Sequence, residues 1–477
     1  MAYTPCFPGW QHRFQTRPLR RELDHLRRCT LDKLEAWISP LLPALPELSA
    51  AAASARERPY SVRHTWWCFL WQMLQLNVSC RQVVRQVLAM RVLAGLPGLD
   101  PGTSAYCQAR ARLPQALLER ALQVSAQAAR QRSAPSLALQ GREVKVMDRT
   151  ALTLRDTAQN QAQYAQLTSQ KPGCGFAFLN LLVVWSARGG AIIDHAEGDY
   201  HHSEMRLMHQ LCPRLTPKDI VIYDRAAGHY MACALLVAQQ VDLISRVMVR
   251  QINWRQGQRL GPNDRLVRWK KSQRKPPYLP LQQWATLPAE LPVRVIRVQL
   301  NRRGFRSHEL VLVTTLLDPA LYPAAEISAA YQRRWRLEMS LDDLKTTLGL
   351  ERLRCQSPAM VQRELLMLLI AHNLVRAVMA LAAHAHAVPL DRLSFTGTLD
   401  TLRCFCSAHA QAAPHTRRRL WTAMLGIVAQ DSLPHRPNRS EPRVVKRRRK
   451  DFPLLNLPRH LYPIFRQATR LRPIKKT

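Results

Sequence analysis

The sequence predicts an α/β fold in which a helical N-terminal region precedes a mixed domain that contains a β-rich insertion. Helical apolar spacing dominates up to about residue 140. Alternating runs rich in β-branched residues begin at about residue 141, and long helical patterns return after Pro319. Between these points the predicted elements follow the order β, β, β, α, β, α, β, and then several short strands. This order describes an α/β domain with a β insertion before its last helices.

The first 140 residues are expected to form a small helical bundle. Helical apolar spacing recurs in four segments, residues 30–48, 78–96, 104–122 and 118–133. Gly95 and Pro97 end the second segment. Arg110 and Arg112 precede Pro114 and give the bundle a basic face. We interpret residues 1–140 as a DNA-binding domain that uses these two arginines, although ordinary solvated charges would produce the same pattern.

The central region is expected to alternate between strands and helices. Residues 141–154 alternate as a strand does, and residues 176–198 predict two strands joined through Gly189 and Gly190 as a hairpin. A helix, a strand–turn–helix unit and a further strand are predicted at residues 203–215, 219–240 and 241–249. The insertion spans about 251–318, and its strand-like runs are residues 266–269, 292–300 and 309–317. Helices then continue to about residue 387.

The charge of the chain indicates a polyanionic partner. Lys and Arg number 70 and Asp and Glu 33, so the formal net charge is +37. Such a field attracts nucleic acid. The eleven cysteines form no paired zinc-ligand spacing, and reduced thiols in a cytosol fit best. The two longest apolar stretches, at residues 66–78 and 365–385, are interpreted as buried helices, so no membrane is expected.

Two carboxylates stand at the ends of apolar strands. Asp148 ends the apolar part of the strand that begins at about residue 141, and Asp224 ends the strand of residues 219–223. The carboxyl ends of strands form the rim of a sheet, where α/β folds place their chemistry. Each residue has a simpler interpretation, because Asp148 could cap the following turn and Asp224 could pair with Arg225. A third acid would favour the catalytic interpretation.

The segment from residue 331 to residue 345 can supply that third acid. At about 100° per residue, Tyr331, Arg334, Glu338 and Lys345 share one narrow face of a helix. A separate apolar stripe, made of Leu337, Leu341, Leu344 and Leu348, can seat this helix against a sheet. A face with one acid among three phosphate-binding groups suits a phosphodiester beside a metal. A solvated face with Glu338 paired to Arg334 is the alternative, and Asp342 is not excluded as the acid.

These residues resemble the signature of insertion-sequence-four-like (IS-four family) transposases of the Asp-Asp-Glu (DDE) class. The spacing Tyr-x2-Arg-x3-Glu-x6-Lys occurs without gaps at residues 331–345. Five further stretches resemble the same family, residues 156–176, 198–207, 304–319, 344–376 and 443–455. The resemblance covers about residues 60–455. Two positions depart from the family pattern: Arg149 follows Asp148 and Ala226 follows Arg225, where the family usually carries glycine.

The resemblance implies a ribonuclease-H-like DDE transposase domain at residues 141–385, followed at residues 386–477 by helix and a basic region for dimerisation or DNA contact. It implies Asp148, Asp224 and Glu338 as catalytic residues and ligands of Mg²⁺, for which Mn²⁺ can substitute. Tyr331, Arg334 and Lys345 would contact DNA. The expected activity is cut-and-paste DNA transposition by hydrolysis and strand transfer.

The expected partners are double-stranded DNA, as terminal inverted repeats and target, and a second copy of the chain on DNA. The expected location is the bacterial cytoplasm, at the nucleoid. In relatives a flipped base stacks on an aromatic ring, for which the insertion offers Trp254, Trp269 and Trp284. A metal-dependent nuclease without strand transfer and a catalytically decayed DNA-binding repressor are the alternatives. The acids and histidines at residues 194–204 are not expected to form a separate metal site, because adjacent side chains of an extended chain point to opposite sides.

Overall fold

The computed structural model describes residues 41–42, 59–75, 77–93, 95–133, 138–299, 309–434 and 458. The predicted helix at residues 30–48, apart from residues 41–42, and the basic run at residues 443–455 lie outside the described residues. The side chains of residues 335–339, in the middle of one helix, also lie outside them.

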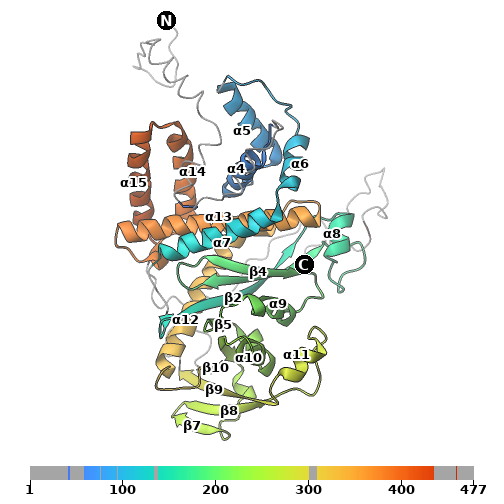
Figure 1. Ribbon diagram of the computed structural model, residues 1–477, viewed down its shortest axis with the longest axis vertical. Coiled ribbons are helices and arrows are strands. Elements are labelled where there is room, and N and C mark those ends of the chain that lie inside the picture. The colour runs from blue at the N-terminus through green and yellow to red at the C-terminus, as the bar shows by residue number, and fades with distance from the viewer. Residues whose placement is uncertain are drawn as a thin grey trace, which may run out of the picture.

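A long mixed sheet runs through the molecule (Figure 1). Its strands follow the order β4-β3-β2-β5-β6-β10-β9-β8-β7, and β1 pairs with β2 off this path. The first strands are β1 (Ala138–Leu139), β2 (Arg142–Thr153), β3 (Phe178–Ser186), β4 (Ile192–Gly198), β5 (Ile220–Tyr223) and β6 (Asp242–Val247). β2 pairs with β5 and β5 with β6 in parallel, whereas β2–β3, β3–β4 and β6–β10 pair antiparallel. The predicted hairpin at Gly189 and Gly190 is confirmed, and both glycines have positive φ.

The predicted insertion is built as an extension of this sheet. It contains β7 (Gln258–Gly261), β8 (Asp264–Lys270), α11 (Leu281–Thr286), β9 (Glu290–Gln299) and β10 (Glu309–Thr314). The three predicted strand runs are confirmed as β8, β9 and β10, whereas the helix α11 was not predicted. β10 pairs with β6, so the insertion continues the central sheet and forms the lower end of the molecule in Figure 1.

Two layers of helices cover the two faces of the central strands. One face packs on α9 (Glu204–Leu211) and α10 (Tyr230–Val237), through a core that includes Met147, Leu182 and Tyr223. Neighbouring residues on the strands point the other way, as β geometry requires. That other face packs on α12 (Ala324–Asp342) through Val146 and Ile222, and on α7 (Gln115–Gln131) and α13 (Pro358–Ala385) through Leu152 and Leu181. The remaining helix near the sheet is α8 (Ala158–Gln163).

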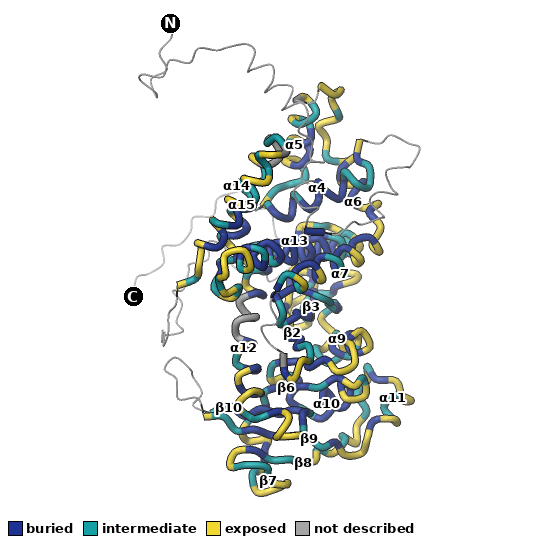
Figure 2. The backbone as a smooth tube through the Cα atoms, turned by 60° about the vertical axis from the view of Figure 1, so that its left-hand side comes forward, coloured by how far each residue is buried: buried dark blue, intermediate teal, exposed yellow. Residues whose placement is uncertain are grey.

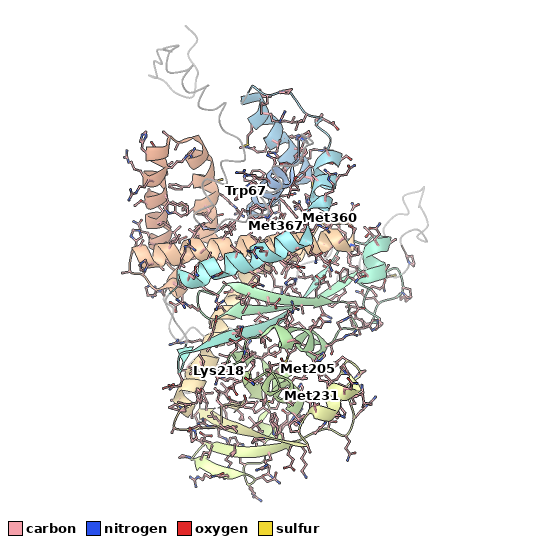
Figure 3. All side chains as sticks on the ribbon, viewed as in Figure 1. Trp67, Met205, Lys218, Met231, Met360 and Met367 are labelled. Atoms are coloured by element: carbon pink, nitrogen blue, oxygen red, sulfur yellow. The ribbon has the colours of Figure 1, made fainter. Side chains whose placement is uncertain are left out.

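Helix α13 joins the helical parts of the molecule. Helices α4 (Val62–Leu74), α5 (Cys80–Leu93) and α6 (Ser104–Arg112) stand on one part of it, and α14 (Phe395–Gln411) and α15 (Pro414–Gln430) on another (Figure 1). Figure 3 shows Trp67 of α4 beside Met367 of α13, and both are buried in the same core. Among the described residues, α13 is the one helix long and apolar enough to cross a membrane, but its apolar window is 89% buried. Figure 2 shows it dark blue along its length, so it is a core helix as predicted.

We predict that buried His372 makes the fold acid-sensitive. Burial, and secondarily Arg376, lowers the pKa of His372 to about 3, whereas the unfolded chain would titrate near 6.5. Between these values the unfolded state binds more protons, so stability falls as pH falls, by about 1.4 kcal/mol per pH unit for this group. Urea unfolding at neutral pH and near pH 5 should show a shallower pH dependence for His372→Leu than for wild type. The same change at the exposed His415 should keep the wild-type dependence.

We predict that a buried ion pair in the insertion carries much of its stability. Arg294 has no exposed surface, and its Nε lies 2.9 and 3.0 Å from the two carboxylate oxygens of Asp264. Arg294→Ala would leave Asp264 buried without its partner, at a cost of about 3–5 kcal/mol in the free energy of unfolding. Arg268→Ala, on the same strand as Asp264 but exposed, should change it by less than about 0.5 kcal/mol.

Chemical denaturation would measure both variants. Replacing both partners, as Arg294→Leu with Asp264→Leu, should recover most of the loss, because no uncompensated charge remains. An Arg294→Ala variant as stable as wild type would show that the pair contributes nothing to the fold.

Candidate active site

The pairing of β2 with β5 brings Asp148 and Asp224 to the same level. The two strands are parallel, with Val144 opposite Ile220 and Val146 opposite Ile222. Two residues further along each strand the same register places Asp148 opposite Asp224. Adjacent strands lie about 4.8 Å apart. Both acids share the face of Val146 and Ile222, so both belong to the side of the sheet that α12 covers.

Helix α12 crosses the face of the sheet on which the two acids lie. Its first part packs on the core that contains Val146 and Ile222, through Ile327, Ala330 and Tyr331. Its end packs on the other core of the same face, through Leu341, and the following turn does so through Leu344 and Leu348. The predicted apolar stripe is therefore confirmed for these three leucines, while Leu337 lies outside the described side chains. Asp148 lies on β2 between Val146 and Leu152, which belong to these two cores.

Tyr331 and Arg334 form a buried pair near Asp224. Tyr331 is 2% exposed and Arg334 7% exposed, and the guanidinium carbon of Arg334 lies 5.6 Å from the centre of the Tyr331 ring. Burial raises the pKa of Tyr331, Arg334 opposes that shift, and the nearby charge of Asp224 adds to it. The predicted proximity of these two residues to an acid is present. Both side chains are buried. Their direct contact with DNA therefore stays a prediction.

Glu338 lies on α12 seven residues after Tyr331. The helix is continuous from Ala324 to Asp342, so position 338 is about 10 Å further along the axis and keeps nearly the same angular position as Tyr331. Its side chain lies outside the described residues. Within the described part of the chain, no group of three or more His, Cys, Asp or Glu side chains is arranged to hold a metal. The assignment of Glu338 as the third acid therefore stays a prediction.

Lys345 does not continue the face of Tyr331 as a regular helix would. Helix α12 ends at Asp342, and residues Asp343–Thr347 form a π-helical turn. Its wider i→i+5 geometry shifts the angular position of Lys345, so the single-face prediction is wrong for this residue. Lys345 Nζ lies 3.5 Å from Glu351, and the predicted alternative partner, Asp342, is exposed.

Asp224 is oriented by the turn that follows it. Its Oδ1 accepts a hydrogen bond of 2.8 Å from the main-chain N–H of Ala226, and Ser245 Oγ donates to its carbonyl oxygen at 2.5 Å. Ala226 and Ala227 sit in a short 3-10 turn with negative φ, so this turn does not require the family glycine. Asp148 Oδ1 similarly accepts from the N–H of Arg149 at 3.0 Å. Two oriented carboxylates offer the hard oxygen ligands that Mg²⁺ or Mn²⁺ prefers.

Two comparisons with known proteins match this arrangement. Residues 139–374 match the family described as "Transposase DDE domain", a span that runs from β1 to α13 and includes the insertion. The chain is also 25% identical over 451 residues to "Transposase InsG for insertion sequence element IS4" of Escherichia coli (strain K12), covering 93% of this chain and 98% of that protein. The chain belongs to the DDE transposase family. It is accordingly a transposase for insertion-sequence transposition.

One solved structure is a distant match to this transposase. It is the "Cryo-EM structure of piggyBac transposase synaptic complex with hairpin DNA (SNHP)", with a TM-score of 0.39 and 9% sequence identity. The match covers 85% of each chain.

Of the two arginines predicted for the helical region of the transposase, one is buried. Arg110 is 5% exposed, its Nη1 and Nη2 lie 3.0 and 3.1 Å from the sulfurs of Cys80 and Cys355, and its guanidinium stacks 4.1 Å from the Phe69 ring. Arg110 therefore lies in the core and not on the basic face predicted for it, and we do not propose it as a DNA contact. Arg112 is exposed and stays a candidate.

The three tryptophans of the insertion are half-buried in the transposase. Trp254 lies under the guanidinium of Arg297 at 4.2 Å, and Trp284 under the ammonium of Lys271 at 4.5 Å. Both rings therefore already carry a cation on one face. Trp269 packs against the same core as the other two.

A polar network that was not predicted from the sequence lies on the other face of the sheet from the two acids. On the α9 face, Arg149 Nη1 donates to Asn180 Oδ1 at 2.7 Å and its Nε lies 3.3 Å from Glu204. Burial raises the pKa of Glu204, Tyr223 and Arg149 lower it, and the charge of Asp224 raises it further. The sequence signal for Glu204 was its position after the N-cap Ser203, which marks the start of a helix rather than a metal cluster.

We predict that Gly228 is required by the turn after Asp224. A Cβ at this position would lie 2.2 Å from the carbonyl oxygen of Arg246, which is main chain and cannot swing aside. Gly228→Ala should reduce the free energy of unfolding by about 1–3 kcal/mol and lower DNA cleavage, because the turn that orients Asp224 must shift. Thermal unfolding and a cleavage assay would measure the two effects. Gly98→Ala, where a Cβ meets nothing within 4 Å, is the matched control, and equal behaviour of the two variants would contradict this account.

Proposed function

We propose that this transposase excises and inserts its element by cut-and-paste transposition, with Asp148, Asp224 and Glu338 as the three acids of a metal-dependent site. The observation that supports this most is the β2–β5 register, which puts Asp148, inside β2, level with Asp224, directly after β5, on the face that α12 crosses. The continuous helix from Tyr331 to Glu338 supports Glu338 as the third ligand. The strand order β4-β3-β2-β5-β6, with the first three strands antiparallel, supports a ribonuclease-H-like core.

In this proposal the three carboxylates would hold Mg²⁺, for which Mn²⁺ can substitute. Bound divalent ions supply charge neutralisation and activation for in-line displacement at phosphorus. The main-chain N–H groups of Arg149 and Ala226 fix the two aspartates, so the site is oriented before DNA arrives. Tyr331 is near Asp224 and pairs with the positively charged Arg334. Lys345 and Arg112 are the proposed contacts to DNA phosphates.

The proposed substrates are double-stranded DNA ends with terminal inverted repeats, and a target duplex. The net charge of +37 supports DNA as partner and implies a steep loss of affinity with added salt. A homodimer on DNA follows from the need to join two element ends. We place this activity in the bacterial cytoplasm, at the nucleoid.

We predict that Asp148→Asn, Asp224→Asn and Glu338→Gln each abolish cleavage of an element-end DNA in Mg²⁺ while binding to that DNA persists. Losing one metal ligand removes the catalytic charge arrangement but few of the phosphate contacts. Cleavage should fall by at least about a thousandfold, as for loss of other essential catalytic groups. Gel assays of cleavage and fluorescence anisotropy of binding would separate the two effects.

Two further variants make this test specific. Asp342→Asn, four residues after Glu338, should retain cleavage. Loss of activity in Asp342→Asn with full activity in Glu338→Gln would move the third ligand to Asp342. Asp156→Asn, exposed in the loop after β2, is the control for removal of one acidic charge.

The outcomes also separate the alternative functions. Wild type that joins pre-cleaved ends to a target is a strand-transfer enzyme. Wild type that cleaves but never joins such ends is a nuclease. Wild type that binds element ends but neither cleaves nor joins them in Mg²⁺ or Mn²⁺ is a DNA-binding repressor, and the proposed activity is then wrong.

A further inference from the structure

Arg149 lies inside β2, beyond the end of β5, on the face opposite to the two aspartates. It follows Asp148 on β2, so its side chain points to the α9 face. Met147 on the same strand and Leu182, the residue opposite Arg149 on β3, point to that face too. Its side chain is 39% exposed, and that of Glu204 21%. The guanidinium therefore lies one residue beyond Asp148 on the opposite face of the sheet, with part of its surface open to solvent.

The partners of Arg149 form a built site. Asn180, on β3, is only 3% exposed and accepts from Arg149 Nη1 at 2.7 Å. The Asn180 amide donates to the carbonyl oxygens of Asp199 and His202 at 3.0 and 3.3 Å, which ties it to the loop before α9. Asn180 is thus fixed by main chain on one side and fixes Arg149 on the other. A surface arginine without a role would not need a buried partner of this kind.

Glu204 keeps this guanidinium directed along the rim. Its carboxylate is 3.3 Å from Arg149 Nε, at the first turn of α9. Among the described residues, no hydrogen-bond or ion-pair partner engages Arg149 Nη2. A planar guanidinium with unused donors matches the oxygens of a phosphate. The Glu204 carboxylate is an anion that a phosphate group can replace.

We propose that Arg149 binds a backbone phosphate of the DNA strand next to the scissile position, and that Glu204 occupies this guanidinium until DNA arrives. The proposal rests on the proposed function, since it requires DNA to cross the rim that carries Asp148 and Asp224. Because Arg149 and Asp148 point to opposite faces, the phosphate that Arg149 holds is a neighbour of the reacting one. Arg149 is thus a positioning residue, and it places the strand over the rim.

The test is the salt dependence of binding to an element-end duplex, measured by fluorescence anisotropy in EDTA so that no cleavage occurs. Arg149→Gln should lower affinity and reduce the slope of log affinity against log salt by about 0.9, the value for one lost phosphate contact. Arg149→Lys should keep most of the slope. Glu204→Gln should raise affinity by up to about fivefold with an unchanged slope, because the competing ion pair is gone.

Arg214 gives a matched control. The Arg214 side chain is 48% exposed, and its Nη1 lies 2.7 Å from the carboxylate of Asp194, whose side chain is 20% exposed. Asp194 is on β4, the edge strand of the sheet, two strands away from β2. Arg214→Gln removes the same charge from a similar half-exposed pair and should leave the slope unchanged.

Two results would overturn the inference. One is an Arg149→Gln slope equal to that of wild type. The other is a parallel loss of thermal midpoint and affinity in Arg149→Gln and Glu204→Gln, which would mean a purely structural pair. If either result is obtained and the wild-type protein still cleaves element ends, the inference about Arg149 is wrong but the proposed function stands. A wild type that does not prefer element-end DNA over unrelated DNA contradicts the proposed function itself.

Discussion

The parallel pairing of β2 with β5 is the constraint on which the rest of the site depends. It places two carboxylates level on adjacent strands, where like charges about 5 Å apart repel by roughly 3 kcal/mol at an effective dielectric constant of 20. The strands hold this arrangement because their other residues, Val146, Ile222 and Tyr223, are buried in cores on both faces. The fold therefore fixes a negative pair that a divalent cation would relieve, and the surrounding chain is strongly basic.

The two faces of this rim have different surroundings. On the side of Asp148 and Asp224, α12 brings the buried Tyr331–Arg334 pair and then position 338. On the other side, α9 brings Glu204 to Arg149. Since successive residues of one strand serve the two faces, adjacent side chains such as Asp148 and Arg149 can carry opposite charges without pairing with each other. The strand's alternation thus separates the proposed metal ligands from the proposed phosphate-binding group within two residues.

Local pattern was enough to predict much of this fold and part of its site. Strand-end position identified Asp224, and apolar spacing identified Leu341, Leu344 and Leu348. Asp148 was singled out as a strand end too, but β2 continues past it to Thr153. Features set by contacts between distant segments were missed. The π-helical turn after Asp342 displaces Lys345, and its Leu344 is buried in the core that includes α13. Arg110 lies between Cys80 and Cys355, 30 and 245 residues away in sequence, so its charge pattern alone suggested a surface residue. Domain boundaries and the orientation of Glu338 stay predictions.

The insertion is linked through the structure to α12, the helix that carries Glu338, the proposed third acid. Because β10 pairs with β6, the insertion shares the sheet that holds Asp224, rather than forming a separate appendage. The buried Arg294 of β9 binds Asp264 and also donates to the carbonyl oxygen of Tyr322 at 2.6 Å, just before α12 begins. The start of α12 is thus tied to the insertion, while its end is tied to α13 by leucines. A helix fixed at both ends by different parts of the sequence holds position 338 at a defined place along its axis. The insertion thereby constrains the geometry of the acids although it contributes none of them.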